Sequence, residues 1–405
     1  MADEEHPAVT NFRKYVRIKT VQPKPDYATC TTYLQGQAEE LGAECQVVEC
    51  VPGKPAVIMT LPGEDPSLPA VLLNSHTDVV PVFPEHWKYD PFSAHKDEAG
   101  DIYGRGTQDM KCVGIQYLEA IKRLQKGGGG GGGGGRFLRT VHLSFVPEEE
   151  LGGLQGMGRL VHTETFKRMN IGVALDEGYA STTDAMKVFY GQRNPWWILI
   201  KCPGQPGHGS QFLQDTAGEK LAKIINFFMA FREQELRRME EDPKLTLGDV
   251  ITINLTKLEG GVQFNVVPAE LSVGFDVRIP PSQIEVFQER LDGWCKEAGE
   301  GITYEFGQKV MEKAVTCAED GKNPWWDAFA SACKKMGVVL EKEIFPASTD
   351  MKYIRRLGIS ALGFSPMNNT PVLLHDHNEY LNEQVFLRGI EIYAEIIPAL
   401  ANLRP

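Results

Sequence analysis

Short apolar runs alternate with amphipathic stretches along the first half of the chain. Apolar residues dominate 70–74, 140–146 and 171–175, as in strands that are buried on both faces of a sheet. Between them, 110–124 repeats apolar side chains at the spacing of one helix face, at positions 110, 113, 117, 118, 121 and 124. This alternation predicts an α/β fold whose mostly parallel sheet is covered by helices on both faces.

The middle of the chain follows a different order of elements, strand–helix–strand–strand–helix–strand. These patterns fall at 195–200, 216–235, 250–258, 271–278, 282–298 and 302–306. The order is typical of a small α+β sandwich. After about residue 312 the first kind of alternation returns, and it ends in a predicted helix over 384–400. We therefore predict one discontinuous α/β domain at 1–190 and 312–405, with an α+β domain inserted at 191–311.

Composition indicates a globular protein. The 405 residues are 42% hydrophobic and 24% charged, which excludes a disordered or collagen-like chain. The net charge is −12, which argues against a nucleic-acid partner because such partners bind largely through phosphate neutralisation. No apolar run approaches the ~18 residues of a membrane span, and residues 1–6 lack the pattern of a secretory signal. Eight cysteines without a Cys-x-x-Cys pair indicate reduced thiols, so we expect a cytoplasmic protein.

The glycine content of the chain is raised by a single tract. Nine of the 41 glycines form the uninterrupted run Gly127–Gly135. A run without side chains cannot hold a defined shape, so we expect a flexible linker on the surface, away from the candidate site.

Candidate chemistry begins where the first predicted strand ends, at His76 and Asp78. Alternate residues of an extended segment point the same way, so the two side chains share a face. Asp78 could then accept the second ring N–H of a metal-bound His76. A surface pair of histidine and aspartate would give the same fragment.

Further acids and a histidine occupy comparable positions. Asp109 precedes the predicted helix, Glu148–Glu150 follow the second strand, Glu177 follows the third, and His375 lies ahead of the last helix. Taken singly, Asp109 could complement a helix dipole and the three glutamates could be a solvated charge run. Ligands of open α/β sheets bind beyond the carboxyl ends of the strands, so the coincidence of these loops favours one shared site.

Several other mechanisms lack their motifs. The sequence contains no Gly-x-Ser-x-Gly elbow, no His-Glu-x-x-His helix and no phosphate-binding Gly-x-x-x-x-Gly-Lys-Ser/Thr loop. The dinucleotide fingerprint Gly-x-Gly-x-x-Gly is matched by the glycine tract, which follows a helix and not a strand. A nicotinamide-dependent enzyme is therefore not supported.

Five segments together resemble the family of dizinc amidohydrolases and exopeptidases, which includes aminoacylases, glutamate carboxypeptidases and dipeptidases. They read LNSHTDVVP at 73–81, RGTQDMK at 105–111, PEEELGG at 147–153, ALDEG at 174–178 and LHDHNE at 374–379. The resemblance covers essentially the whole chain apart from the glycine tract. It implies a zinc-hydrolase catalytic domain, with the inserted domain serving as a dimerisation or lid domain.

The resemblance implies two zinc ions per subunit. Asp109 would bridge them, His76 and Glu177 would bind one ion, and Glu150 and His375 the other. Two histidines and three carboxylates give each ion three protein contacts and leave a position for a bridging water.

The resemblance also implies roles for residues that bind no metal. Glu149 would be the general base, with Asp78 nearby in the catalytic site. His208 of the inserted domain would reach the partner subunit's site and stabilise the oxyanion. Asn265 and Arg278 would bind the substrate, and Arg278 would bind the carboxylate of the substrate. The residues alone leave a turn histidine, a strand-end asparagine and a surface arginine as alternatives.

We therefore predict a zinc-dependent homodimeric enzyme that hydrolyses N-acyl-L-amino acids to a carboxylate and a free L-amino acid. A dipeptidase or carboxypeptidase on the same scaffold is the alternative, because the same metal motifs serve both. A non-catalytic binding protein is disfavoured, since the base and all five ligands are present. We expect small-molecule substrates and no nucleic-acid or membrane partner.

Overall fold

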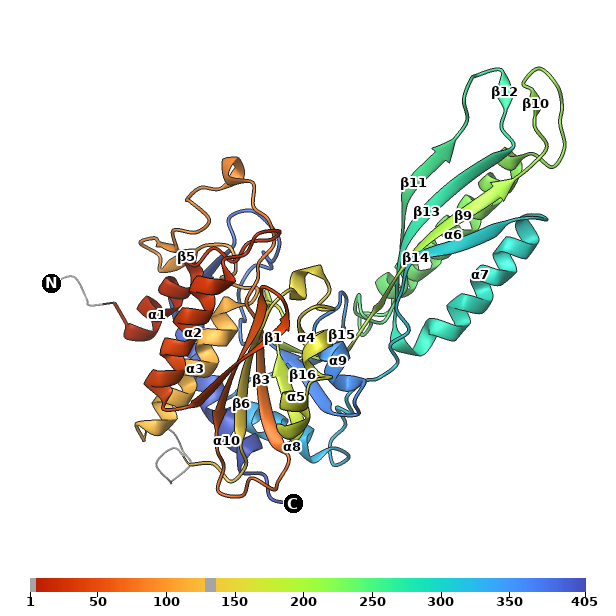
Figure 1. The fold of residues 1–405 in the computed structure, drawn as a ribbon. Helices are drawn as coiled ribbons and strands as arrows, with labels where there is room; N and C mark the ends of the chain where they lie inside the picture. The colour runs from red at the N-terminus through yellow and green to blue at the C-terminus, as the bar shows by residue number, and fades with distance from the viewer. Residues whose placement is uncertain (1–4, 128–135) are drawn as a thin grey trace. The chain divides into compact units, whose positions relative to one another are not determined.

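A computed structural model describes residues 5–127 and 136–405 (Figure 1). By its internal contacts the chain divides into two compact units, which are described separately below. Unit 1 comprises Met1–Tyr190, Thr316–Lys342 and Thr349–Pro405, and unit 2 comprises Gly191–Val315 and Glu343–Ser348. The expected linker in the glycine tract lies, from residue 128 onward, outside the described residues.

The large sheet has eight strands in the order β1-β2-β6-β3-β7-β16-β8-β15. Their bounds are β1 Glu44–Val51, β2 Lys54–Leu61, β3 Ala70–His76, β6 Val141–Val146, β7 Ile171–Asp176, β8 Met186–Gln192, β15 Leu340–Phe345 and β16 Ser360–Phe364. The four strands β6, β3, β7 and β16 run parallel, whereas β1 with β2, β2 with β6, and β8 with β16 pair antiparallel. The three predicted apolar runs form β3, β6 and β7 at the centre.

Strand β3 shows why these runs are mostly apolar. Val71 and Leu73 pack into one buried cluster, and Leu72 between them packs into a second cluster on the other face. The first cluster is completed by α1 Pro7–Val16, α2 Tyr27–Leu41, α3 Lys111–Gln125, α8 Pro324–Lys335 and α10 Glu383–Ala401. The second is completed by α4 Met157–Leu160, α5 Glu164–Arg168 and α9 Met351–Arg355. The predicted fold class, with helices on both faces of the sheet, is confirmed.

Helix α3 lies unusually close to the sheet because of Gly114. A Cβ at this position would come within 2.8 Å of the Ser75 hydroxyl and 2.9 Å of the Phe145 ring. Glycine removes that obstacle, so the first turn of α3 lies against the ends of β3 and β6. The loop that carries Asp109, just before α3, is thereby held at this edge of the sheet.

A small three-stranded sheet in unit 1 joins distant parts of the sequence. Its order is β17-β5-β4, with β17 Tyr380–Asn382, β5 Asp101–Tyr103 and β4 His95–Lys96. Tyr380 pairs with Tyr103 across it. This pairing brings residue 379 beneath the loop that begins at residue 104.

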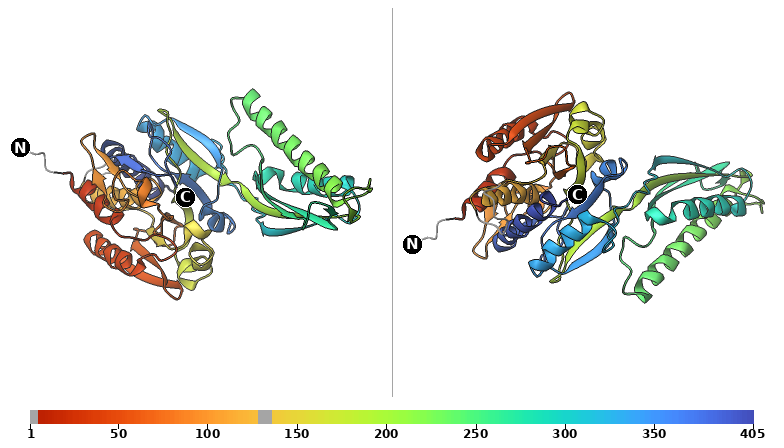
Figure 2. Two further views of the ribbon diagram at one scale, coloured as in Figure 1. Left: turned by 90° about the horizontal axis from the view of Figure 1, so that it is seen from above. Right: turned by 90° about the horizontal axis from the view of Figure 1, so that it is seen from below.

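Unit 2 has an antiparallel four-stranded sheet in the order β11-β13-β9-β14. Its strands are β9 Asn194–Pro203, β11 Thr252–Gly260, β13 Glu270–Ile279 and β14 Thr303–Lys309, and its helices are α6 Ala217–Glu241 and α7 Ile284–Ala298. Both helices lie on the same face of this sheet (Figure 2). Trp196, Phe228, Phe275 and Phe287 pack between them and the strands. The predicted order of elements is present, with two short additional strands, β10 Gly207–His208 and β12 Val266–Val267.

The longest described helix, α6, has 25 residues and begins with a capping box in which Thr216 and Glu219 satisfy each other's backbone N–H groups. Its buried residues Ile224, Phe228 and Phe231 pack against the sheet. Across the described ranges, no helix is both long enough and apolar enough to cross a membrane.

Candidate metal centre

The candidate site in unit 1 lies where three neighbouring parallel strands end. His76 is the last residue of β3 and pairs in register with Val146, the last residue of β6. Glu149 and Glu150 follow β6 within one turn, and Glu177 follows β7 directly. Parallel strands present their carboxyl ends at one edge, which is why these loops meet.

Hydrogen bonds and ion pairs connect all five predicted ligands into one cluster. The His76 Nε2 lies 2.9 Å from Asp109 Oδ1 and 3.3 Å from Glu177 Oε2. On the other side, the His375 Nε2 lies 3.1 Å from Asp109 Oδ2 and 3.0 Å from Glu150 Oε2. The two oxygens of Asp109 therefore face different histidines, which is the arrangement expected of a carboxylate between two ions.

Electrostatics in the cluster favour protonated histidines beside a charged Asp109. Burial lowers the pKa of His76, but Glu177 and Asp109 outweigh burial and raise the pKa well above its ordinary value. Hydrogen bonds to Asp109 and Glu150 raise the pKa of His375 to about 10. Burial raises the pKa of Glu150 to about 7. Protons on the two histidines thus supply the positive charge that a bound divalent cation would otherwise supply to these carboxylates.

The residues present fit a divalent metal pair. Two sets of donor atoms each lie within 4.8 Å of one another, His76 with Asp109 and Glu150, and His76 with Glu149 and Glu177. The Glu150 Oε1 is buried without a hydrogen-bond partner among the described residues. Nitrogen and carboxylate donors in this number suit zinc, and also cobalt or manganese.

Glu149 lies in a 3₁₀ turn, Glu149–Leu151, and is 8% exposed. Burial raises the pKa of its carboxyl well above the ordinary range. The turn closes through Gly152 and Gly153, both with positive φ, and a side chain at Gly153 would overlap the Asp350 carboxylate. Glu149 and Glu150 are thus adjacent in the chain while their carboxylates join different donor sets.

Asp78 does not hold His76 in the way that its position suggested. The His76 Nδ1 lies 2.9 Å from the backbone carbonyl oxygen of Asp78 and 3.8 Å from its carboxylate. The Asp78 carboxylate instead accepts hydrogen bonds from the Glu149 backbone N–H, at 3.1 Å, and from the Gln22 Nε2, at 2.7 Å. It therefore fixes the turn that carries Glu149.

Glu379 organises the loop that carries Asp109, a function that the sequence did not reveal. Its carboxylate has no exposed surface. Four donors reach it: Arg105 Nη1 at 2.9 Å and the backbone N–H groups of Gly106 at 3.0 Å, Gln108 at 2.6 Å and Asp109 at 3.3 Å. Its place in the segment 374–379 was the only signal available.

Asp350 is a second acid that sequence analysis did not identify. It precedes α9, is completely buried, and neither carboxylate oxygen has a hydrogen-bond partner within the described ranges. Burial raises the pKa of Asp350 well above its usual range, and its charge is among the causes that raise the pKa of Glu149. No motif or strand end marks residue 350 in the sequence.

The remaining predicted residues lie in unit 2. His208 in β10 is exposed, and its Nδ1 lies 2.8 Å from the Ser210 hydroxyl. Asn265 lies just before β12, which pairs with β10, and its carbonyl accepts the Gly209 N–H at 2.9 Å. The structure therefore brings His208 and Asn265 together. Arg278 lies near the end of β13, separate from that pair.

Comparisons with known proteins converge. The model of Peptidase family M20/M25/M40 matches residues 72–399. Aminoacylase-1B of Rattus norvegicus is 56% identical over 402 residues, covering 99% of this chain and 97% of its own length. Aminoacylase-1 of Dictyostelium discoideum is 46% identical over 413 residues, covering 99% of each chain.

Solved structures show the same fold at low sequence identity. The YXEP protein of Bacillus subtilis, described as a dinuclear metal-binding peptidase of the M20 family, superposes with a TM-score of 0.67 at 15% identity, covering 98% of each chain.

Proposed function

The chain belongs to peptidase family M20/M25/M40 and is a metal-dependent amidohydrolase, and we propose that it hydrolyses N-acyl-L-amino acids to a carboxylate and a free L-amino acid. The observation that carries this proposal is Asp109, whose two oxygens face His76 and His375 with the buried Glu149 alongside. The substrate class follows from the full-length similarity to proteins named aminoacylase-1.

We propose that the cluster holds two zinc ions, with Asp109 between them, His76 and Glu177 on one side, and Glu150 and His375 on the other. When bound, such a pair would acidify the attacking water and polarise the acyl carbonyl. Glu149 then takes the proton of the attacking water and delivers it to the leaving amine nitrogen. Its burial beside the donor atoms of His76 and Glu177 supports this role, because it places the carboxyl within the cluster and away from bulk water.

We also propose roles in substrate binding for residues of unit 2. Arg278 binds the carboxylate of the amino acid, for which a planar guanidinium offers two parallel N–H groups. His208 donates to the developing oxyanion through its Nε2, and Asn265 contacts the substrate nearby. The Ser210 hydroxyl at the Nδ1 of His208 supports this orientation, since it leaves the Nε2 to face outward.

We further propose that the chain acts as a homodimer in which His208 enters the partner subunit's site. Support comes from the surface around β10 and β12. Phe212 and Phe264 are fully exposed there, at 107% and 110%, and Val262 is 87% exposed. Large apolar side chains on the same short strands and loops as two polar site residues are typical of a surface that another molecule covers.

A substrate comparison tests the proposed activity. Turnover of N-acetyl-L-methionine is measured against the matched dipeptides Ala-Met and Met-Ala, with chelated enzyme and with enzyme reloaded with zinc. We expect the N-acetyl compound to give the highest kcat/KM and chelation to abolish it. A preference for a dipeptide would support the alternative peptidase activity, and activity that survives full chelation would overturn the metal mechanism.

The role of Glu149 is tested by Glu149→Gln. This variant removes the proton acceptor and keeps the shape, so it should retain zinc and lose kcat by about 10²–10⁴-fold. Zinc content by atomic absorption and turnover are measured together, with Glu164→Gln as the control, because Glu164 is an exposed partner of Lys167. A near-normal kcat in the zinc-loaded variant would remove Glu149 from the mechanism.

Subunit mixing tests the proposed action of His208 in the partner subunit. Inactive His208→Ala and Glu149→Gln subunits, exchanged at random, form mixed dimers with one intact site each. About a quarter of the parental activity should return, by this statistical count. No recovery, with subunit exchange verified by native mass spectrometry, would contradict the arrangement.

A further inference from the structure

The guanidinium of Arg278 is held by a carboxylate on its own strand. Asp276 lies two residues earlier in β13, so both side chains project from the same face. The Arg278 Nε lies 2.6 Å from Asp276 Oδ1, and its Nη2 lies 2.9 Å from Oδ2. This bidentate pair fixes one edge of the guanidinium. The pair is partly shielded, with the two side chains 31% and 25% exposed.

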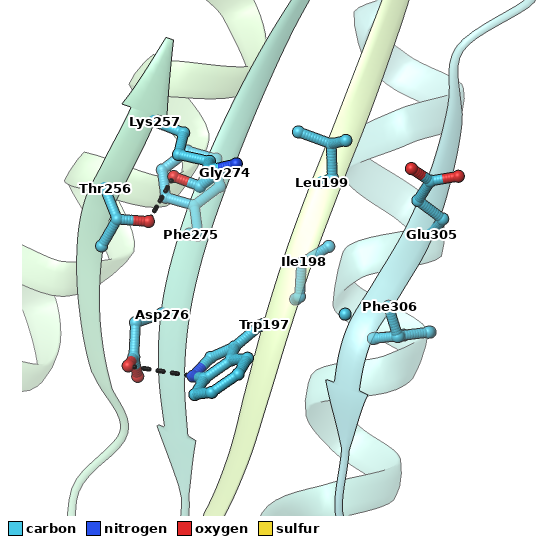
Figure 3. Close-up of a pocket in the computed structure, with 11 residues that line it drawn as sticks. Trp197, Ile198, Leu199, Thr256, Lys257, Gly274, Phe275, Asp276, Glu305 and Phe306 are labelled. Carbon is cyan, nitrogen blue, oxygen red and sulfur yellow. Dashed lines mark hydrogen bonds between the residues drawn. The ribbon is translucent and has the colours of Figure 1, made fainter. Parts of the chain in front are cut away.

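Asp276 is in turn held by Trp197 on the neighbouring strand β9. The two residues are paired across the sheet, and the indole Nε1 lies 3.2 Å from Asp276 Oδ2 (Figure 3). Oδ2 therefore accepts from both the indole and the guanidinium. Three N–H groups on one carboxylate leave its plane little freedom to rotate.

The setting of Trp197 indicates that this contact is not a by-product of core packing. Its neighbour Trp196 points into the core and is completely buried, whereas Trp197 is 49% exposed on the opposite face of the sheet. It borders a cavity of about 610 Å³ that Gly274 and Gly307 also line (Figure 3). A Cβ at Gly307 would lie in ordinary van der Waals contact with Trp197, 3.7 Å from its Cβ.

The pairing leaves the other edge of Arg278 available. A guanidinium has five N–H groups, and Asp276 takes one at Nε and one at Nη2. In the described parts of the chain, the Nη1 of Arg278 has no hydrogen-bond partner. An N–H group of Nη1 and the second N–H group of Nη2 form a pair that can donate two parallel hydrogen bonds to a second carboxylate. An arginine already oriented in this way loses less side-chain freedom when the ligand binds.

We infer that Asp276 and Trp197 are positioning residues, which hold the free edge of Arg278 towards the carboxylate of the substrate. The inference rests on the proposed function of Arg278 and adds two residues that act through it. Asp276 supplies the charge that fixes the guanidinium, and Trp197 fixes Asp276. Neither residue touches the substrate in this scheme, so both should affect substrate affinity and leave the chemical step unchanged.

The test measures kcat and KM for N-acetyl-L-methionine in single and double variants. Asp276→Asn places an amide NH₂ group against N–H donors of Arg278 or Trp197, so hydrogen bonds to that side of the side chain are lost. We expect KM to rise about tenfold, with kcat within twofold of the parent. Trp197→Phe keeps the apolar ring and loses the N–H, and we expect KM to rise about threefold. Arg278→Ala should raise KM the most, and adding either substitution to it should change KM less than twofold further, because the partner through which both act is gone.

Each outcome decides one part of the inference. If Arg278→Ala leaves KM unchanged, the proposed role of Arg278 fails. If it raises KM while Asp276→Asn and Trp197→Phe do not, Arg278 binds the carboxylate and the positioning inference fails. Equal effects of Asp276→Asn with and without Arg278 would indicate a merely structural role. Glu305 lines the same cavity and pairs with Lys201. The matched control is therefore Glu305→Gln, which should keep the kcat and KM of the parent.

Folding is followed separately in these variants. Trp197→Phe leaves the Asp276–Arg278 ion pair intact, so it tests the inference even if Asp276→Asn does not fold. Far-ultraviolet circular dichroism and Tm are measured for each variant, and we expect Trp197→Phe to match the Glu305→Gln control in both. A threefold rise in KM at parental Tm would support positioning, and a parental KM at parental Tm would overturn the role of Trp197.

Discussion

Glu379→Gln perturbs the metal centre without touching a predicted ligand. The substitution keeps the shape of the side chain and removes its charge. Each oxygen of Glu379 accepts two of the four hydrogen bonds described above, with Oε2 facing Arg105 and Gly106 and Oε1 facing the backbone of Gln108 and Asp109. A glutamine has one such oxygen, so its NH₂ group faces two donors whichever way the amide is turned.

The expected cost follows from these contacts. Removing one member of a buried ion pair leaves Arg105, only 3% exposed, without its countercharge, which costs about 3–5 kcal/mol. The two lost hydrogen bonds to a charged acceptor are part of the same loss and are not added to it. At roughly 2–4 °C per kcal/mol for a domain of this size, the Tm of unit 1 should fall by roughly 10 °C. Freeing the Asp109 N–H should also weaken zinc binding about 10–100-fold.

Calorimetry and competitive zinc titration measure the two effects. Glu164→Gln serves again as the control in the same unit, because its exposed ion pair with Lys167 should contribute little to Tm. A lower Tm with weaker zinc binding is the expected result. Parental values of both quantities in Glu379→Gln would refute the claim that this carboxylate holds the loop of Asp109.

Three further outcomes are expected. Burial lowers the pKa of His142 to about 4, against about 6.5 in the unfolded chain. Between these two pH values the unfolded chain binds more protons than the folded chain. The free energy of unfolding therefore falls as pH falls through this window, by up to about 3 kcal/mol. His142→Gln should therefore lose less stability than the parent between pH 7 and pH 4.5 in urea unfolding. Gly114→Ala should crowd Ser75 and Phe145 and cost about 1–3 kcal/mol, measured as a lower denaturation midpoint. Removal of metal by a chelator should abolish turnover and lower Tm, and added zinc should restore both, because ligand binding to the folded state alone stabilises it.

The parts of the fold that the sequence predicted are those with a local cause. A strand buried on both faces is mostly apolar, so β3, β6 and β7 appear in the sequence as short runs dominated by apolar residues. An amphipathic helix such as α6 repeats its apolar residues with the period of a helix turn. The five motifs lie at the ends of such elements, and the family resemblance that they carry is confirmed by the match over residues 72–399.

The parts that the sequence did not predict depend on the path of the backbone through loops. Asp78 is two residues after His76, and this spacing allowed either a contact between their side chains or an unconnected surface pair. The observed contact with His76 uses the Asp78 backbone carbonyl, and the carboxylate reaches the loop after β6, 71 residues away. Glu379 is 271 residues from Gln108, and the pairing of β17 with β5 brings them together. No local pattern encodes a hydrogen bond between two irregular segments.

At three places in the molecule, a carboxylate accepts a hydrogen bond from a residue to which a chemical role is assigned. Asp78 accepts the backbone N–H of Glu149, Glu379 accepts the backbone N–H of Asp109, and Asp276 accepts the guanidinium of Arg278. In each case an acid fixes the residue to which a chemical role is assigned, because a carboxylate with several donors resists rotation.

Substitutions of these three supporting acids should have effects that can be told apart by measurement. Loss of Asp78 frees the turn that carries the proton acceptor Glu149 and should lower kcat, whereas loss of Asp276 releases a binding group and should raise KM. Loss of Glu379 releases a ligand-bearing loop and weakens metal binding. Neutral, shape-preserving substitutions at the three positions should therefore change three different measured constants. A common loss of stability in all three variants, with no such separation, would show that these acids serve the fold and not the site.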